Sequence, residues 1–171
     1  MIRVAVVTIS DGVAAGTRED RSGAELLHRA GALGWKVEDR RVVSDDVPAI
    51  SALLVALASS GAVDVILTTG GTGLGPRDVT PEATRAIADR EVAGFGERMR
   101  SEGAKHTVRA ALSRSGAYTR GEVLILNFPG SPKGALESLE AVAGLIPHAV
   151  DLLHGRTEHD NAKQSKAKPS T

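Results

Sequence analysis

The stretch Val63–Arg90, VDVILTTGGTGLGPRDVTPEATRAIADR, carries a strand signal, a glycine-rich loop and a helix signal in direct succession. Its first seven residues are nearly all apolar or β-branched, as in a strand buried on both faces of a parallel sheet. Four glycines follow within the six residues Gly70–Gly75. Thr80 then offers an N-cap hydroxyl, and Pro81 suits the first helical position, where a missing N–H costs nothing. The stretch predicts one strand–loop–helix unit of an α/β fold.

The same alternation runs through most of the chain. Short apolar runs predict strands at 2–9, 35–44, 63–69 and 122–128. Helical spacing with proline starts and glycine ends predicts helices at 22–33, 47–59, 80–90 and 129–153, and one or two short helices within 94–114. We expect an α/β fold, a three-layer α/β/α sandwich with a mostly parallel sheet, and a half-buried or edge strand at 35–44, where apolar and polar residues alternate.

The length of 171 residues suits one domain, which we place at 1–155. The polar and aperiodic residues 156–171 are interpreted as a C-terminal tail.

Composition excludes several classes of protein. Twenty-one Lys and Arg balance 21 Asp and Glu, and no basic run is interleaved with aromatic residues, so nucleic acid is not expected as a partner. Cysteine is absent, which excludes disulfides and thiolate metal sites. No apolar run reaches the length of a membrane span, and the first residues resemble a strand rather than a signal peptide. We therefore expect a cytoplasmic protein without a membrane partner.

Polar or glycine-rich residues follow each of the four predicted strands. They are Ser10-Asp11-Gly12, Ser44-Asp45-Asp46, Thr69 to Gly73, and Asn127 to Lys133. Because parallel strands end at the same edge of a sheet, and ligands of open α/β sheets bind there, these four segments are expected to meet in one site.

The glycine loop matches neither a Walker A loop, which needs Lys-Ser or Lys-Thr after the glycines, nor a dinucleotide fingerprint. One or two glycines would indicate only a tight turn. Four of them favour close approach of backbone N–H groups to an anion, helped by the positive end of the helix that we place at Thr80.

Acidic residues lie beside this predicted anion site. Asp78 could cap the helix, and Asp45 and Asp46 could form a solvated turn. Taken together, these carboxylates follow two different strands and lie beside a predicted phosphate-binding loop. A Mg²⁺ ion that is also bound to phosphate requires such a set of oxygen ligands.

A second anion candidate lies in NFPGSPKGAL, where Gly130 and Ser131 lead into a helix and Lys133 is near its first turn. A capped helix start explains the first two residues equally well. The helix dipole disfavours a lysine at the positive, N-terminal end of a helix. The presence of Lys133 there therefore favours an anionic ligand. The five histidines show no metal-ligand spacing, and no nucleophile has a base beside it.

The motifs TTGGTGLGPRDVTPEAT, GFGERMR, AALSR and LILNFPGSPKGA, in this order, resemble those of the MoaB/Mog family of molybdenum cofactor biosynthesis, specifically its molybdopterin adenylyltransferases. The resemblance runs from Val4 to about Leu153. It implies ATP and molybdopterin as substrates, Mg²⁺ as cofactor, a homotrimer, and transfer of the product to a molybdate-insertion protein. A family member that binds the pterin but has little activity, serving as a carrier or scaffold, is the alternative.

The resemblance also implies roles for individual residues. The catalytic, metal-holding acids fall on Asp78 and on Asp45, with Asp46 as the alternative to Asp45. The positions that match the pterin and nucleotide pocket are Ser10, Asp11, Gly70, Gly71, Thr72, Gly73, Ser113, Asn127, Gly130, Ser131 and Lys133. Adenylyl transfer needs positioning and charge neutralisation rather than a side-chain nucleophile, in agreement with the residues found.

Overall fold

A computed structural model of the chain describes residues 1–156, so that of the predicted tail only Arg156 is described. Its elements are, in chain order, β1 Arg3–Ile9, α1 Asp11–Ala14, α2 Arg21–Ala32, β2 Lys36–Val43, α3 Val47–Ala58, β3 Val65–Thr69, α4 Thr80–Arg85, β4 Arg90–Glu91, α5 Ala93–Ala104, the 3₁₀ helix η1 Val108–Leu112, β5 Gly116–Arg120, β6 Val123–Phe128, α6 Pro132–Val142, the 3₁₀ helix η2 Ala143–Leu145 and α7 Ile146–Leu153. None of these helices is long and apolar enough to cross a lipid bilayer.

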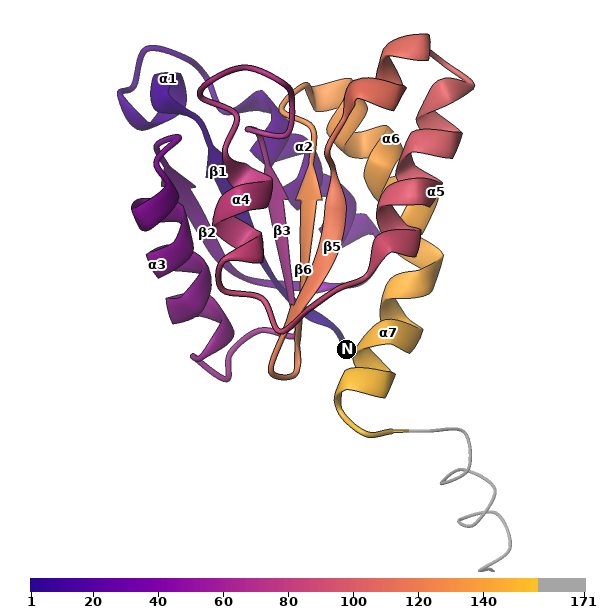
Figure 1. The fold of residues 1–171 in the computed structure, drawn as a ribbon. Coiled ribbons are helices and arrows are strands. Elements are labelled where there is room, and N and C mark those ends of the chain that lie inside the picture. Colours follow the sequence, from indigo (N-terminus) through magenta and orange to yellow (C-terminus); the bar gives the residue numbers. More distant parts are fainter. Residues whose placement is uncertain (157–171) are drawn as a thin grey trace, which may run out of the picture.

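The strands form one six-stranded sheet in the order β2-β1-β3-β6-β5-β4 (Figure 1). β1 pairs in parallel with β2 and β3, and β3 pairs in parallel with β6. Only β5 runs in the opposite direction, since it is antiparallel to both β6 and β4. The predicted mostly parallel sheet, with residues 36–43 as an edge strand, is confirmed.

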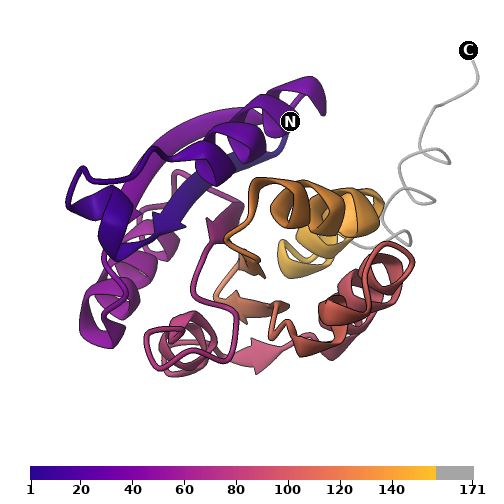
Figure 2. The same cartoon turned by 90° about the horizontal axis from the view of Figure 1, so that it is seen from above.

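Helices cover both faces of the sheet, which confirms the three-layer sandwich (Figure 2). Alternate residues of each central strand face opposite ways, so two separate apolar cores form. One core joins the sheet to α3 and α4 through residues such as Ile50, Leu54 and Ala83. The other joins it to α2, α5, α6 and α7 through residues such as Leu26 and Leu139.

Two predicted helices differ from the structure. The helix predicted at 129–153 is broken into α6, η2 and α7. The break falls at Gly144, which is a poor helix former, and just before Pro147, which suits the start of α7. The helix predicted at 80–90 ends at Arg85, and the N–H of Asp89 donates to Thr119 O at 2.8 Å as the chain enters the sheet edge. Tertiary pairing thus outweighs helical propensity in this segment.

The prediction that Thr80 caps α4 is wrong. Val79 occupies the N-cap position, no side chain caps the helix, and Thr80 is its first residue. The Thr80 hydroxyl donates to Gly70 O at 2.8 Å, and the Thr80 N–H donates to Gly71 O at 3.1 Å. Pro81 has no N–H, so the first two residues of α4 offer no free donor to an anion. They hold the glycine loop instead.

Candidate active site

A cavity of about 990 Å³ lies at the edge where β1, β2, β3 and β6 end. This volume is at the upper end of the range for ligand pockets. All four polar segments predicted to meet contribute to it. Among the lining residues are Ser10, Asp45, Thr69, Gly70, Gly71, Thr72, Gly73, Asp78, Ser113, Gly130 and Ser131.

The glycine loop lines the cavity and carries backbone N–H groups that lack a partner within residues 1–156. Gly70 and Gly71 have φ of +108° and +65°, which side chains rarely allow. The Gly70 N–H donates to Phe128 O at 3.1 Å and anchors the loop to the end of β6. The N–H groups of Gly71, Thr72 and Gly73 bind no acceptor in the described part of the chain. Three successive free donors at a cavity wall suit an anionic ligand.

Asp78 folds back onto the loop that precedes it. Its Oδ2 accepts the Gly75 N–H at 2.8 Å. A Cβ added to Gly73 or to Gly75 would lie 2.7 or 2.9 Å from this same oxygen. The two glycines are therefore required by the position of the Asp78 carboxylate, which lines the cavity beside the free donors.

Asp45 and Asp11 exchange hydrogen bonds across the ends of two strands. The Asp11 N–H donates to Asp45 Oδ2 at 2.8 Å, and the Asp45 N–H donates to Asp11 Oδ1 at 3.0 Å. That backbone bond and the bidentate Arg77 guanidinium lower the pKa of the Asp11 carboxyl. Burial raises the pKa of the Asp45 carboxyl, and the like charges of Asp11 and Asp78 act in the same direction. Asp45 thus lines the cavity with the carboxylates of Asp11 and Asp78 nearby, of which Asp11 is paired with Arg77.

Asp46 has a different role from its neighbour. Its carboxylate accepts the Ala49 N–H at 3.0 Å and caps α3, and it does not line the cavity. Of the two adjacent acids, only Asp45 is directed at the site.

Arg114 joins the glycine loop to α4. Its Nε donates to Gly73 O at 2.8 Å, and its Nη2 donates to Asp78 O at 2.6 Å. Its backbone N–H donates to Thr72 O at 2.9 Å, and its Nη1 forms an ion pair with Glu82. Burial raises the pKa of the Glu82 carboxyl, but the hydrogen bond and charge of Arg114 outweigh it and hold this pKa below its ordinary value. Arg114 therefore fixes both ends of the segment that presents Asp78.

The second predicted loop lies opposite the acids. Ser131 Oγ accepts the Gly134 N–H at 3.1 Å, which confirms the predicted cap of α6. A Cβ on Gly130 would lie 3.2 Å from Gly70 Cα, so the two loops are in close contact. Lys133 is outside the cavity, 82% exposed, with its Nζ 3.8 Å from Glu137 Oε1. This ion pair one helical turn away explains the lysine without a ligand.

Asn127 and Asp11 also lie outside the cavity lining. Asn127 is fully buried, and its Oδ1 accepts hydrogen bonds from the hydroxyls of Thr68 at 2.9 Å and Thr84 at 3.2 Å. It thereby ties β3 and β6 to α4 beneath the loop. Asp11 lies at the rim, where it orients the backbone of Asp45.

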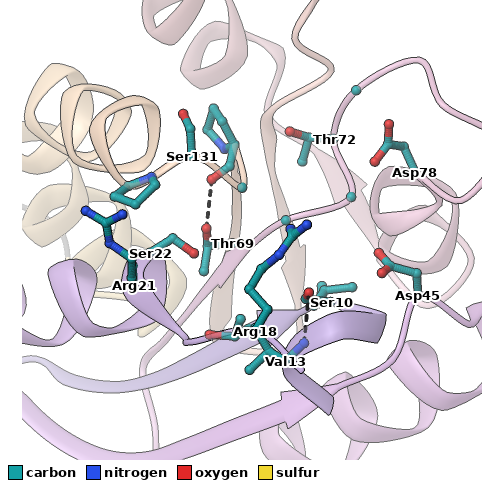
Figure 3. A pocket seen from close by; sticks show the side chains of 18 of the residues that line it. Ser10, Val13, Arg18, Arg21, Ser22, Asp45, Thr69, Thr72, Asp78 and Ser131 are labelled. Atoms are coloured by element: carbon teal, nitrogen blue, oxygen red, sulfur yellow. Dashed lines mark hydrogen bonds between the residues drawn. The ribbon is translucent and has the colours of Figure 1, made fainter. Parts of the chain in front are cut away.

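Three arginines line the cavity that the sequence motifs did not reveal: Arg18, Arg21 and Arg109. Figure 3 shows Asp45 and Asp78 on one side of the pocket, Arg21 with Ser22 and Ser131 on the other, and Arg18 extending between them. The cavity has an acidic side and a basic side.

No group of three or more His, Cys, Asp or Glu side chains suited to a metal occurs within residues 1–156. A cation at this site would have two carboxylates, Asp45 and Asp78, and would need its remaining ligands from water and a bound phosphate. Mg²⁺ prefers this combination. Burial is the main cause of the raised pKa of the Asp45 carboxyl, the charges of Asp11 and Asp78 contribute less, and a bound cation would oppose all three effects.

Comparison with known proteins agrees with this geometry. Residues 5–148 match the family described as "Probable molybdopterin binding domain". The molybdopterin adenylyltransferase of Helicobacter pylori J99 is 38% identical, with 97% of this chain and 96% of the relative covered. The enzyme of the same name from Escherichia coli K12 is 37% identical over 90% and 86% of the two chains.

Solved structures show the same fold. The crystal structure of the molybdopterin biosynthesis enzyme MoaB from Thermus thermophilus superposes with a TM-score of 0.85, at 48% identity, covering 91% of this chain and 98% of that one. The chain belongs to the family of molybdopterin binding domains that includes these biosynthetic proteins.

Proposed function

We propose that the protein is a molybdopterin adenylyltransferase of molybdenum cofactor biosynthesis. It transfers AMP from ATP to the terminal phosphate of molybdopterin and releases pyrophosphate. The observation that carries the proposal is the pairing of two carboxylates, Asp45 and Asp78, with three backbone donors that have no acceptor within residues 1–156, all in one cavity. The curated relatives named molybdopterin adenylyltransferase, 37–38% identical over most of the chain, support it.

The proposed reaction needs no nucleophile from the protein. An oxygen of the molybdopterin phosphate bonds to the α-phosphorus of ATP, while the bond from this phosphorus to the bridging oxygen of the β-phosphate breaks. The attacking oxygen is already ionised near neutral pH, so no base has to remove a proton. The protein supplies positioning and charge neutralisation, which are the main contributions to phosphoryl-type transfer. The N–H groups of Gly71, Thr72 and Gly73 would hold phosphate oxygens.

Magnesium fits the acidic side of the cavity, where Asp45 and Asp78 would hold it. When bound with ATP, it would neutralise charge on the phosphates. Asp11 and Arg77 orient Asp45, and Gly75 and Arg114 orient Asp78. A homotrimer, a cytoplasmic location, and delivery of adenylyl-molybdopterin to a molybdate-insertion protein belong to the same proposal.

A pyrophosphate-release assay tests the proposal. Purified protein is incubated with ATP, Mg²⁺ and molybdopterin, and pyrophosphate is measured by a coupled enzymatic assay. We expect release that depends on the pterin and on the metal. Binding of molybdopterin without any release would instead support the carrier or scaffold function. Tight binding of an unrelated phosphate ester, with no affinity for the pterin, would argue against both.

Arg114 provides a prediction about positioning. Arg114→Ala removes the donors to Gly73 O and Asp78 O and leaves Glu82 without its partner. We expect turnover to fall about tenfold or more, because displacement of a positioned group by about 1 Å can cost up to ~10² in rate. Arg114→Lys, which keeps the charge but not the forked donors, is expected to be intermediate.

Steady-state kinetics with varied Mg²⁺ and ATP measures the effect, and thermal unfolding checks that the variant is folded. Arg98→Ala is the matched control, because Arg98 also donates to a backbone carbonyl, that of Ala141, but lies outside the cavity. Unchanged kinetics in a folded Arg114→Ala protein would remove the positioning role.

A further inference from the structure

Four arginines differ from the others in having no partner for the guanidinium within the described residues. Within residues 1–156, every other arginine binds a carboxylate or a backbone carbonyl through its guanidinium. Arg18, Arg21, Arg90 and Arg109 make no side-chain hydrogen bond or ion pair in this part of the chain. Three of these four, all except Arg90, line the cavity. Free guanidinium groups are therefore concentrated at one site.

These three arginines come from separate elements. Arg18 lies in the loop between α1 and α2, Arg21 is the first residue of α2, and Arg109 belongs to η1. Figure 3 shows Arg21 on the same side of the pocket as Ser131, the cap of α6, and across the pocket from Asp45 and Asp78. The positive ends of α2 and α6 add to the arginine charge on this side.

The acidic residues on the same side do not cancel this charge. Asp20 lines the cavity, but its carboxylate already binds Arg40 at 2.8 Å, the Thr8 hydroxyl at 2.9 Å and the Gly23 N–H at 2.9 Å. Glu19 is the one other carboxylate of this side among the lining residues. With the charges of Asp45 and Asp78 assigned to the metal, three guanidinium groups against the single charge of Glu19 leave a positive surplus of two.

We propose that Arg18, Arg21 and Arg109 bind the phosphate monoester of the acceptor, while the metal-bound nucleotide occupies the acidic side. The inference rests on the proposed function and divides its cavity between the two substrates. A phosphate monoester carries about −1.5 to −2 charge near neutral pH, which matches a positive surplus of this size. Guanidinium groups bind such oxygens in bidentate fashion.

The division of the cavity between the acceptor phosphate and the nucleotide has a chemical reason. Adenylyl transfer brings two anions together, and their repulsion opposes the approach of the acceptor oxygen to the α-phosphorus. Arginines neutralise the acceptor phosphate without entering the coordination shell of the metal. Asp45 and Asp78, being carboxylates, would repel the acceptor phosphate unless the metal lay between them.

The experiment measures binding of each substrate separately. Arg18→Ala, Arg21→Ala and Arg109→Ala are titrated with molybdopterin, with its dephosphorylated form, and with ATP plus Mg²⁺. We expect the Kd of molybdopterin to rise about tenfold or more in Arg18→Ala and Arg21→Ala, since hydrogen bonds between charged groups contribute about 1.5–3 kcal/mol. The Kd of ATP is expected to change less than about threefold. The dephosphorylated pterin is expected to bind wild type and variants alike.

Arg90→Ala is the matched control, because Arg90 is an equally unpartnered arginine within residues 1–156 but lies outside the cavity, and it should change no Kd. Lysine at 18 or 21 should restore part of the affinity for molybdopterin. A weaker affinity for ATP with unchanged affinity for molybdopterin would overturn the inference, as would no change in either. The binding measurement does not depend on turnover. A weaker affinity of the variants for molybdopterin therefore supports the inference even if the wild-type protein releases no pyrophosphate. If the wild type does not bind molybdopterin, both proposals fail.

Discussion

Asp78→Asn is expected to lower the turnover of adenylyl transfer by at least ~10²-fold while the protein remains folded. Asparagine has the size of aspartate and can still accept the hydrogen bond that Gly75 N–H makes to Asp78 Oδ2. It cannot supply the negative charge that a metal at the acidic side requires. The loss is therefore assigned to electrostatics rather than to loop geometry.

Turnover is measured by pyrophosphate release over a range of Mg²⁺ concentrations, and the fold is checked by thermal unfolding. Asp46→Asn is the matched control: this acid follows Asp45 directly, but it caps α3 outside the cavity, and asparagine is an equally good cap. Wild-type turnover in Asp78→Asn would remove Asp78 from the mechanism. A larger loss in Asp46→Asn than in Asp45→Asn would show that the wrong member of the pair has been assigned.

Gly70→Ala is expected to destabilise the protein by about 3 kcal/mol or more. Gly70 has a φ of +108°, and an added Cβ would lie 2.1 Å from the carbonyl oxygen of Ile9. This oxygen belongs to the last residue of β1, which pairs with β2 on one side and β3 on the other, so the backbone there cannot move without disturbing the sheet. Strain and overlap act together, so the loop and the ends of two strands have to shift.

Urea unfolding of wild type and variant measures the difference in free energy of unfolding. Gly31→Ala is the control, because Gly31 lies within α2 and its added Cβ would meet nothing within 4 Å. We expect this second change to stabilise the protein by about 0.5–1 kcal/mol, since alanine is the better helix former. A Gly70→Ala protein as stable as wild type would contradict the described loop geometry.

The sequence was sufficient to predict the central sheet and the segments that meet at its edge. The strands at 3–9, 65–69 and 123–128 are continuous apolar runs, because both of their faces are buried. The segment Gly116–Arg120 was not predicted as a strand, since GAYTR is short, begins with glycine and ends with arginine. Pairing with β6 determines its conformation, and this long-range contact leaves no local pattern.

The site shows the same division between local and long-range signals. Asp45, Asp78 and the glycines follow strand ends, so topology alone was enough to bring them together. The role given to Thr80 was wrong because its hydroxyl reaches a carbonyl ten residues earlier, and a capping pattern cannot reveal this contact. Arg18, Arg21 and Arg109 were missed because an exposed arginine looks the same in sequence whether it faces a cavity or open solvent.

The fate of the α-phosphate tests the central proposal most directly. The protein is incubated with molybdopterin, Mg²⁺ and ATP labelled at the α-phosphorus, and the products are separated by chromatography. We predict that the label appears in adenylyl-molybdopterin, in an amount equal to the pyrophosphate released. Label that stays in ATP, or that appears in free AMP regardless of molybdopterin, would contradict the proposal.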